Sequence, residues 1–323
     1  MMQAVAADIG GTHARFAIAT RADDGTITLT HEAKLKVAEF ASLQTAWEAY
    51  AAGLGAPMPR LAGVAVAAPV DGELLKLTNN PWVIRPALIG ERLGMEKLML
   101  INDFAAVAHA IAAVGENDFV HVAGPVAPVS QARTISVVGA GTGLGVALLM
   151  RDGATTRVVP TEGGHMDFAP LDSLEDMVLN QLRARYRRVS VERIVSGPGL
   201  ANIYAALAAI EGRAVTPGDD SALWAAAISA PDSLEQAALD RWCLSFGSVC
   251  GDLVLAQGGD ALVLAGGIVP RIAHLLGESG FHGRFVAKGR FEARMAGIPV
   301  WRITHPEPGL LGAAAAAFLE ADR

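Results

Sequence analysis

Two short glycine-rich segments are the parts of this chain best suited to chemistry. Residues 8–12 read Asp-Ile-Gly-Gly-Thr, and residues 139–143 read Gly-Ala-Gly-Thr-Gly. Each lies between apolar runs typical of strands, so each predicts a tight hairpin. Because glycine has no side chain and reaches backbone angles closed to other residues, such a turn lets main-chain N–H groups approach a polyphosphate closely. The pair indicates a duplicated architecture that uses ATP.

The side chains in these turns favour the same chemistry. Thr12 and Thr142 add hydroxyl donors, and Asp8 falls at the end of the first strand. A carboxylate there repels phosphate unless a cation stands between them, and Mg²⁺ with its retained waters is the expected intermediary. For either turn alone, the alternative is an ordinary hairpin that needs glycine only for its shape.

Other nucleotide motifs do not fit. Position 144 is Leu and the chain continues as a strand after the second turn, which argues against a dinucleotide-binding fingerprint. The chain has no Gly-Lys-Ser/Thr phosphate loop and no His-Arg-Asp or Asp-Phe-Gly set of the protein-kinase type.

A candidate general base follows another apolar run. Residues 98–101 predict a strand that leads into Asn102 and Asp103, and a helical pattern starts at Phe104. A carboxylate at this junction is favoured in its ionised form by the helix dipole, and it can accept a proton from a well-placed hydroxyl. The alternative is that Asp103 only caps the helix.

Residues 161–167, Thr-Glu-Gly-Gly-His-Met-Asp, predict a tight loop that presents Glu162 and His165. Glutamate accepts hydrogen bonds and histidine donates or accepts them, which suits a polyol. A metal site formed by Glu162, His165 and Asp167 is an alternative, but no other His or Cys falls at a spacing that completes it. A solvent-exposed turn is the other alternative.

Three further segments could complete a pocket. Residues 78–82, Thr-Asn-Asn-Pro-Trp, offer amides such as Asn79 and an aromatic wall, or else form a polar turn over a core tryptophan. Glu192 precedes a glycine break, and taken alone it predicts a surface pair with Arg193. The Ala-Gly-Gly of residues 265–267 follows a buried-looking strand and could admit the flat face of adenosine, or form a plain strand-to-helix turn.

Composition limits the classes of partner. The chain has 323 residues, 52% hydrophobic and 18% charged, with a formal net charge of −7. This predicts a soluble globular protein whose partner is a small molecule, with no nucleic acid or membrane bound. Its two cysteines exclude a disulfide framework or a Cys-rich zinc site. The N-terminus shows no basic region before an apolar segment, so we expect the cytoplasm.

Periodicity predicts an α/β fold with helical insertions. Strands are expected at 3–8, 14–20, 26–30, 62–68, 98–101, 134–140, 144–150 and 261–265. Helices are expected near 40–54, 104–114, 171–188, 198–211, 219–229 and 232–257. Residues 115–133 are expected to connect two lobes, and the last helix, 310–319, to return to the first lobe.

Together these segments resemble the bacterial hexokinase-like glucokinases, of the superfamily that also holds actin and the heat-shock chaperone ATPases. The resemblance runs nearly the full length and includes residues 8–15, 101–104, 139–145, 162–165, 196–199 and 265–271. It implies a two-lobed actin-like ATPase (ribonuclease H-like) fold with a central cleft. The expected domains are a small one, residues 1–114 plus 310–323, and a large one, residues 115–309.

The resemblance also implies ATP-dependent phosphorylation of glucose at its 6-hydroxyl, with Mg²⁺, by a homodimer. Asp103 would be the catalytic base. The positions expected to contact glucose are Asn79, Asn102, Asp103, Glu162, His165 and Glu192. Those expected at the nucleotide are Asp8 (for Mg²⁺, through water), Gly10, Gly11, Thr12, Gly141, Thr142, Gly143, Gly266 and Gly267. His13 departs from the family, where Asn is expected in many relatives, and no Cys-rich zinc motif of the related branch occurs.

Two alternatives share parts of this pattern. A kinase for another hexose, such as mannose or fructose, has the same catalytic parts. A sugar-responsive regulator would bind glucose without catalysis, but it would need an added DNA-binding module. The first turn begins at Asp8, which leaves no room for such a module in front of it.

Overall fold

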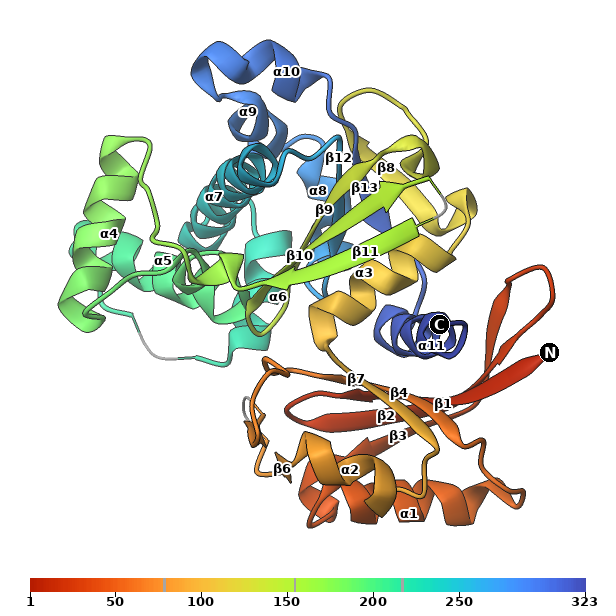
Figure 1. The fold of residues 1–323 in the computed structure, drawn as a ribbon. Helices are drawn as coiled ribbons and strands as arrows, with labels where there is room; N and C mark the ends of the chain where they lie inside the picture. The colour runs from red at the N-terminus through yellow and green to blue at the C-terminus, as the bar shows by residue number, and fades with distance from the viewer. Residues whose placement is uncertain (78–79, 154, 216–217) are drawn as a thin grey trace. The chain divides into compact units, whose positions relative to one another are not determined.

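The structure is a computed structural model that describes residues 1–77, 80–153, 155–215 and 218–323. Residue contacts divide the chain into two compact units (Figure 1). Unit 1 comprises Met1–Asp118, Thr156–Pro160 and Thr304–Arg323, and unit 2 comprises Phe119–Thr155 and Thr161–Ile303.

The sheet of unit 1 begins with an antiparallel meander of β1 (Met2–Ile9), β2 (His13–Arg21) and β3 (Ile27–Lys36). β4 (Leu61–Val66) and β7 (Lys97–Asn102) then add in parallel, which gives the order β3-β2-β1-β4-β7. β3 runs beyond the predicted 26–30. Its pairing with β2 shifts register between Phe16 and Ile18, and His31 has φ 53°, so a bulge carries the strand on to Lys36.

Side chains of β1 alternate between two cores, as the period of a strand requires. Val5, Ala7 and Ile9 pack with Trp47 and Tyr50 of α1 (Leu43–Leu54), in a core that also includes α2 (Pro86–Arg92). Ala4 and Ala6 face the other way, onto α11 (Pro308–Ala321). A small two-stranded ribbon, β5 (Leu75–Lys76) and β6 (Val83–Ile84), borders the first core.

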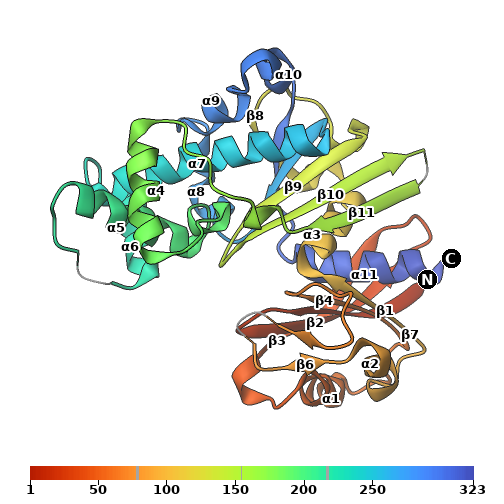
Figure 2. The ribbon, with the colours of Figure 1, turned by 60° about the vertical axis from the view of Figure 1, so that its left-hand side comes forward.

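The alanine-lined face of the sheet brings α11 very close. A Cβ added to Gly63 of β4 would overlap the backbone of Ala313, and one added to Gly312 would overlap the backbone of Ala106 in α3 (Asp103–Ala113). Figures 1 and 2 show α3 and α11 side by side. The N-terminal end of α3, which carries Asp103, is therefore fixed by tight helix packing.

A six-stranded sheet, formed mostly by unit 2, repeats this arrangement. β9 (Thr134–Ala140) and β10 (Leu144–Asp152) form an antiparallel hairpin, with β11 (Thr155–Thr161) next to β10. β12 (Ala261–Ala265) and β13 (Val300–Ile303) add in parallel on the other side, and β8 (Phe119–Ala123) closes the order β11-β10-β9-β12-β13-β8. A hairpin, a third strand and two parallel strands follow in the same order as in unit 1, so the predicted duplication is confirmed.

The helices of unit 2 gather around α7 (Leu234–Gln257), which packs with α5 (Gly197–Ile210), α6 (Asp220–Ser229) and α9 (Phe281–Val286). α4 (Ser173–Arg185) packs on α5, and α8 (Val269–Leu276) and α10 (Glu292–Ala296) complete the unit. Both cysteines are buried free thiols on α7. In the described part of the chain, no helix is long and apolar enough to cross a membrane.

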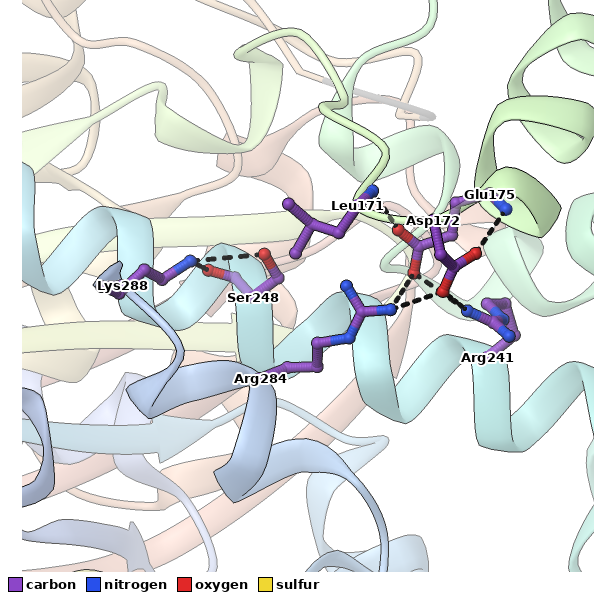
Figure 3. A network of polar contacts seen from close by, with 7 residues as sticks. All are labelled: Leu171, Asp172, Glu175, Arg241, Ser248, Arg284 and Lys288. Carbon is purple, nitrogen blue, oxygen red and sulfur yellow. Dashed lines mark hydrogen bonds and ion pairs between the residues drawn. The ribbon is translucent and has the colours of Figure 1, made fainter. Parts of the chain in front are cut away.

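A network of ion pairs joins three of these helices (Figure 3). Asp172 caps α4 and accepts from the Glu175 N–H at 2.9 Å, and Arg284 of α9 lies 2.6 Å from its carboxylate. Arg241 of α7 contacts both Asp172 and the buried Glu175. Burial alone would raise the pKa of Asp172, but the Glu175 N–H and the two arginines outweigh it and hold the pKa below its usual value.

Every predicted strand and helix is present, with ends shifted by a few residues. The stretch 115–133, which is expected to connect two lobes, also forms a strand that was not predicted. It contains β8, which pairs with β13. The strands that were not predicted, β8, β11 and β13 among them, are short or polar, so their patterns are weak.

Candidate active site

The first glycine turn joins β1 to β2 in unit 1. The Gly10 N–H donates to the His13 carbonyl at 3.0 Å, and the Gly10 carbonyl accepts from Asn80 Nδ2 at 2.9 Å. Among the described residues, no acceptor lies within hydrogen-bond reach of the Gly11 and Thr12 N–H groups. The turn therefore presents two successive backbone donors, the arrangement that binds an anion.

Asp8 ends β1 beside this turn, with 18% of its side chain exposed. Arg15 Nη1 lies 3.3 Å from Asp8 Oδ2, and Arg15 Nε lies 3.3 Å from a carboxylate oxygen of Glu307. Burial raises the pKa of Asp8, Arg15 opposes the rise, and Glu307 adds to it. Gly309 packs against the Asp8 carboxylate so closely that a Cβ there would overlap it.

These oxygens fit the donor set that Mg²⁺ prefers. Asp8 and Glu307 both contact the Arg15 guanidinium, and the pKa of Asp8 is raised, so a nearby cation would favour its ionised form. The described residues contain no group of three or more His, Cys, Asp or Glu side chains that could hold a metal by themselves. A magnesium ion here would keep most of its ligands from water and phosphate.

Asp103 is the first residue of α3, directly after β7. Asn102 is the residue that caps the helix, since its Oδ1 accepts from the N–H groups of Phe104 at 2.9 Å and Ala105 at 3.1 Å. Asp103 Oδ1 accepts from the Phe104 N–H at 2.8 Å, and the residue is partly exposed. The alternative that Asp103 serves as the cap is therefore wrong, and Nδ2 is the group through which Asn102 could donate to a ligand.

The second glycine turn joins β9 to β10 in unit 2. The Gly141 N–H donates to the Gly143 carbonyl at 2.8 Å, and the Gly141 carbonyl accepts from the Gly197 N–H at 2.7 Å. In the part of the chain that the structure describes, the N–H groups of Thr142 and Gly143 have no acceptor. This turn therefore offers two successive donors, as the first one does.

Glu192 also holds this turn, because its Oε2 accepts from the Leu144 N–H at 2.9 Å. The surface pair with Arg193 that the residue types alone suggested is wrong: the Arg193 guanidinium lies over the Tyr186 ring, 4.3 Å from its centroid. Glu192 lies in η5 (Val191–Arg193), a 3₁₀ turn just before α5.

The turn after β12 lies beside the second glycine turn. Gly266 has φ 86°, and a Cβ there would overlap the backbone of Ala140, whose carbonyl accepts from the Ile268 N–H at 3.1 Å. Gly266 is thus required for close packing of β12 on β9. A Cβ at Gly267 would meet nothing within 4 Å, so Gly267 has open space on that side.

Glu162 and His165 come together as predicted: Glu162 directly precedes η4 (Gly163–His165), and His165 is the last residue of η4. Glu162 Oε2 lies 3.8 Å from His165 Nε2, and the two side chains are 64% and 56% exposed. A Cβ at Gly164 would overlap the Leu144 carbonyl, so glycine is required there. The pair is accessible to a ligand.

Arg188 supports this loop. It donates to the His165 carbonyl at 2.7 Å, and its Nε lies 2.6 Å from Asp167 Oδ1. Asp167 is thus paired with an arginine, which counts against the alternative metal site with Glu162 and His165.

Two residues hold the backbone at these motifs. Asn80, one of the two amides of the segment 78–82, clamps the first turn, although only Asn79 is assigned to the site from the sequence, and Arg188, which was not anticipated, holds the loop of His165. Their signal in the sequence is weak, since both act through backbone carbonyls distant along the chain. Asn79 lies outside the described residues.

Two sheets of matching strand order, each with a donor-bearing glycine hairpin, define a protein of the actin-like ATPase fold. The family model described as Glucokinase matches residues 5–320. The chain belongs to the glucokinase family.

Individual proteins agree with this assignment. The chain is 56% identical over 315 residues to a glucokinase of Zymomonas mobilis, across 98% of this chain and 97% of the other. A crystal structure of glucokinase from an Antarctic psychrotroph is 34% identical, with a TM-score of 0.87 and 99% of each chain covered. A ROK family glucokinase from Streptomyces griseus, solved with glucose and AMPPNP, is 17% identical with a TM-score of 0.63 over 98% of this chain and 99% of that one. That last likeness concerns the fold alone.

Proposed function

We propose that the protein is a glucokinase, which transfers the terminal phosphoryl group of ATP to the 6-hydroxyl of D-glucose and releases glucose 6-phosphate and ADP. The observation that carries this is the 56% identity to a glucokinase over nearly the whole chain. The site chemistry supports it, since each glycine turn offers two unpaired N–H donors among the residues described.

In this proposal Asp103 accepts the proton of the 6-hydroxyl as the oxygen attacks the terminal phosphorus. Its position at the first residue of a helix that is capped by Asn102 and packed on α11 gives the carboxylate a fixed backbone. Asn79, Asn102, Glu162, His165 and Glu192 are proposed to bind the hydroxyls of glucose. Positioning and charge stabilisation then supply most of the rate enhancement.

The proposed nucleotide ligands are the N–H and hydroxyl groups of the two turns, with Gly266 and Gly267 beside adenosine. Asp8 is proposed to hold Mg²⁺ through water. When bound, Mg²⁺ neutralises charge on the phosphates. The N–H groups of Gly11, Thr12, Thr142 and Gly143 have no acceptor among the described residues, which supports the phosphate assignment.

The resemblance supports further proposals about the whole protein. We propose that it acts in the cytoplasm as a homodimer and supplies glucose 6-phosphate to glycolysis. We also propose domains of residues 1–114 plus 310–323 and residues 115–309, close to but not identical with the two contact-based units.

An ADP-release assay across several hexoses and phosphoryl donors tests the proposal. We expect ADP release with ATP, Mg²⁺ and glucose, a lower kcat/KM with mannose and fructose, and little release without sugar. A higher kcat/KM with another hexose would transfer the assignment to that sugar. Glucose binding without ADP release would support a regulator instead of an enzyme.

A further inference from the structure

Glu192 links two parts of unit 2 that the proposed function treats separately. Its carboxylate is proposed to bind glucose, yet its Oε2 already accepts from the Leu144 N–H at 2.9 Å at the end of the second glycine turn. Gly143 packs directly on the same carboxylate, and a Cβ at that position would overlap Oε2. The turn and the glutamate are therefore shaped to fit one another.

The backbone around Glu192 continues this link toward the loop of Glu162 and His165. The Val191 N–H donates to the Met166 carbonyl at 2.8 Å, and Asp167 forms a β-bridge with Ser190. Glu192 is half-buried, and its neighbour Val191 is in the core of the unit. Hydrogen bonds thus connect the loop of Glu162 and His165 to η5, and η5 to the second glycine turn.

The bond to Leu144 bears on phosphate binding through the orientation of the peptide planes. The donor N–H groups of the turn belong to Thr142 and Gly143, directly before Leu144. One end of the turn is fixed by Gly197 and the other by Glu192. The peptide between Gly143 and Leu144 is held at its carbonyl by the Gly141 N–H and at its N–H by Glu192. Without the carboxylate only the first of these bonds is left, so the orientation of the neighbouring donors is less well fixed.

We propose that Glu192 is a positioning residue of the second glycine turn, so that affinity for the nucleotide phosphates depends on Glu192 even when no sugar is bound. This inference rests on the proposed function for the identity of the nucleotide. It separates two roles of one carboxylate, because a residue that only bound sugar would leave nucleotide affinity in sugar-free solution unchanged.

The test is the Kd of Mg·AMPPNP measured by calorimetry without sugar. Glu192→Ala and Glu192→Asp both remove an acceptor within reach of Leu144, the second while keeping the charge, and we expect each to weaken binding about 10-fold or more. Glu192→Gln keeps an acceptor oxygen and should stay within about threefold of the unmodified protein. Glu278→Gln is the matched control, since it makes the same kind of change at an exposed glutamate of unit 2 outside the proposed site, and its sugar-free Kd should not change.

Circular dichroism checks that each variant folds, and if Glu192→Ala does not, Glu192→Asp carries the test. AMPPNP affinity in Glu192→Asp equal to that of the unmodified protein would overturn the inference while leaving the proposed function intact. Conversely, an unmodified protein that binds AMPPNP but releases no ADP with glucose would overturn the proposed function and leave the role of Glu192 standing.

Discussion

At the scale of single residues, the chemistry depends on one carboxylate. Asp103 follows a strand and opens α3, while the capping is done by Asn102. Replacing Asp103 with Asn keeps the shape of the side chain and removes its ability to accept a proton. We expect kcat to fall by at least ~10²-fold with folding unchanged, measured by ADP release with saturating glucose.

Asp220→Asn is the matched control for this variant. Asp220 is also the first residue of a helix, α6, and it follows a capping residue, Asp219. Asp220→Asn therefore removes the same favourable interaction between a carboxylate and a helix N-terminus, at a position outside the proposed site. Turnover in Asp103→Asn equal to that of the control would mean that another group is the base.

At the scale of elements, α3 carries a partly buried titratable group, His109. Burial, and to a lesser degree Arg323, lowers the pKa of His109 from 6.5 to about 4. The neutral imidazole is thus favoured in the folded chain, and its contribution to stability is lost as the pH falls from 6.5 toward 4. From this shift we expect His109 by itself to lower the free energy of unfolding by about 2 kcal/mol at pH 5 relative to pH 7.5.

Urea denaturation at the two pH values tests this expectation. His109→Gln has no imidazole to protonate, so from pH 7.5 to pH 5 it should lose about 2 kcal/mol less free energy of unfolding than the unmodified protein does. His274→Gln, at an exposed histidine of α8, should lose as much as the unmodified protein does. An identical pH dependence in His109→Gln and the unmodified protein would show that other groups cause the acid loss.

The close contact between α11 and α3 can also be tested by mutation. Gly312→Ala places a Cβ against the backbone of Ala106, and neither helix can move without disturbing the sheet beneath α11. We expect a loss of about 1–3 kcal/mol in the free energy of unfolding. Gly53→Ala in α1 is the control, because a Cβ there meets nothing within 4 Å and should add about 0.5–1 kcal/mol of helix stability. A free energy of unfolding of Gly312→Ala equal to that of the unmodified protein would mean that α11 and α3 do not pack this closely.

The elements also show how far the sequence could predict the structure. Both hairpins and the strand before Asp103 were predicted, because apolar runs next to glycine or a polar junction are local signals. β8 was missed, since Gly124, Pro125 and Pro128 dominate its surroundings, and β11 contains Pro160. The bonds from Asn80 to Gly10 and from Glu192 to Leu144 span 70 and 48 residues, so only the fold reveals them.

At the scale of the whole molecule, a ligand site can cost stability in the unliganded chain. Asp8 has a raised pKa, so the folded chain holds its proton more tightly than the unfolded chain does. The free energy of unfolding therefore falls as the pH rises from 3.8 through that raised value, and the cost persists at neutral pH. Binding of a magnesium nucleotide would offset it, because a cation beside Asp8 favours the ionised form.

Asp8→Asn separates stability from ligand binding. The amide resembles the neutral acid, so without ligand we expect a melting temperature at pH 7.5 at least equal to that of the unmodified protein and up to a few °C higher. The rise in melting temperature on adding Mg·ADP should be largely lost, since the variant has no carboxylate to favour the metal. Asp23→Asn removes an exposed carboxylate from the same unit and should change neither value. A lower melting temperature in Asp8→Asn together with a full Mg·ADP shift would mean that Asp8 stabilises the fold and takes no part in metal binding.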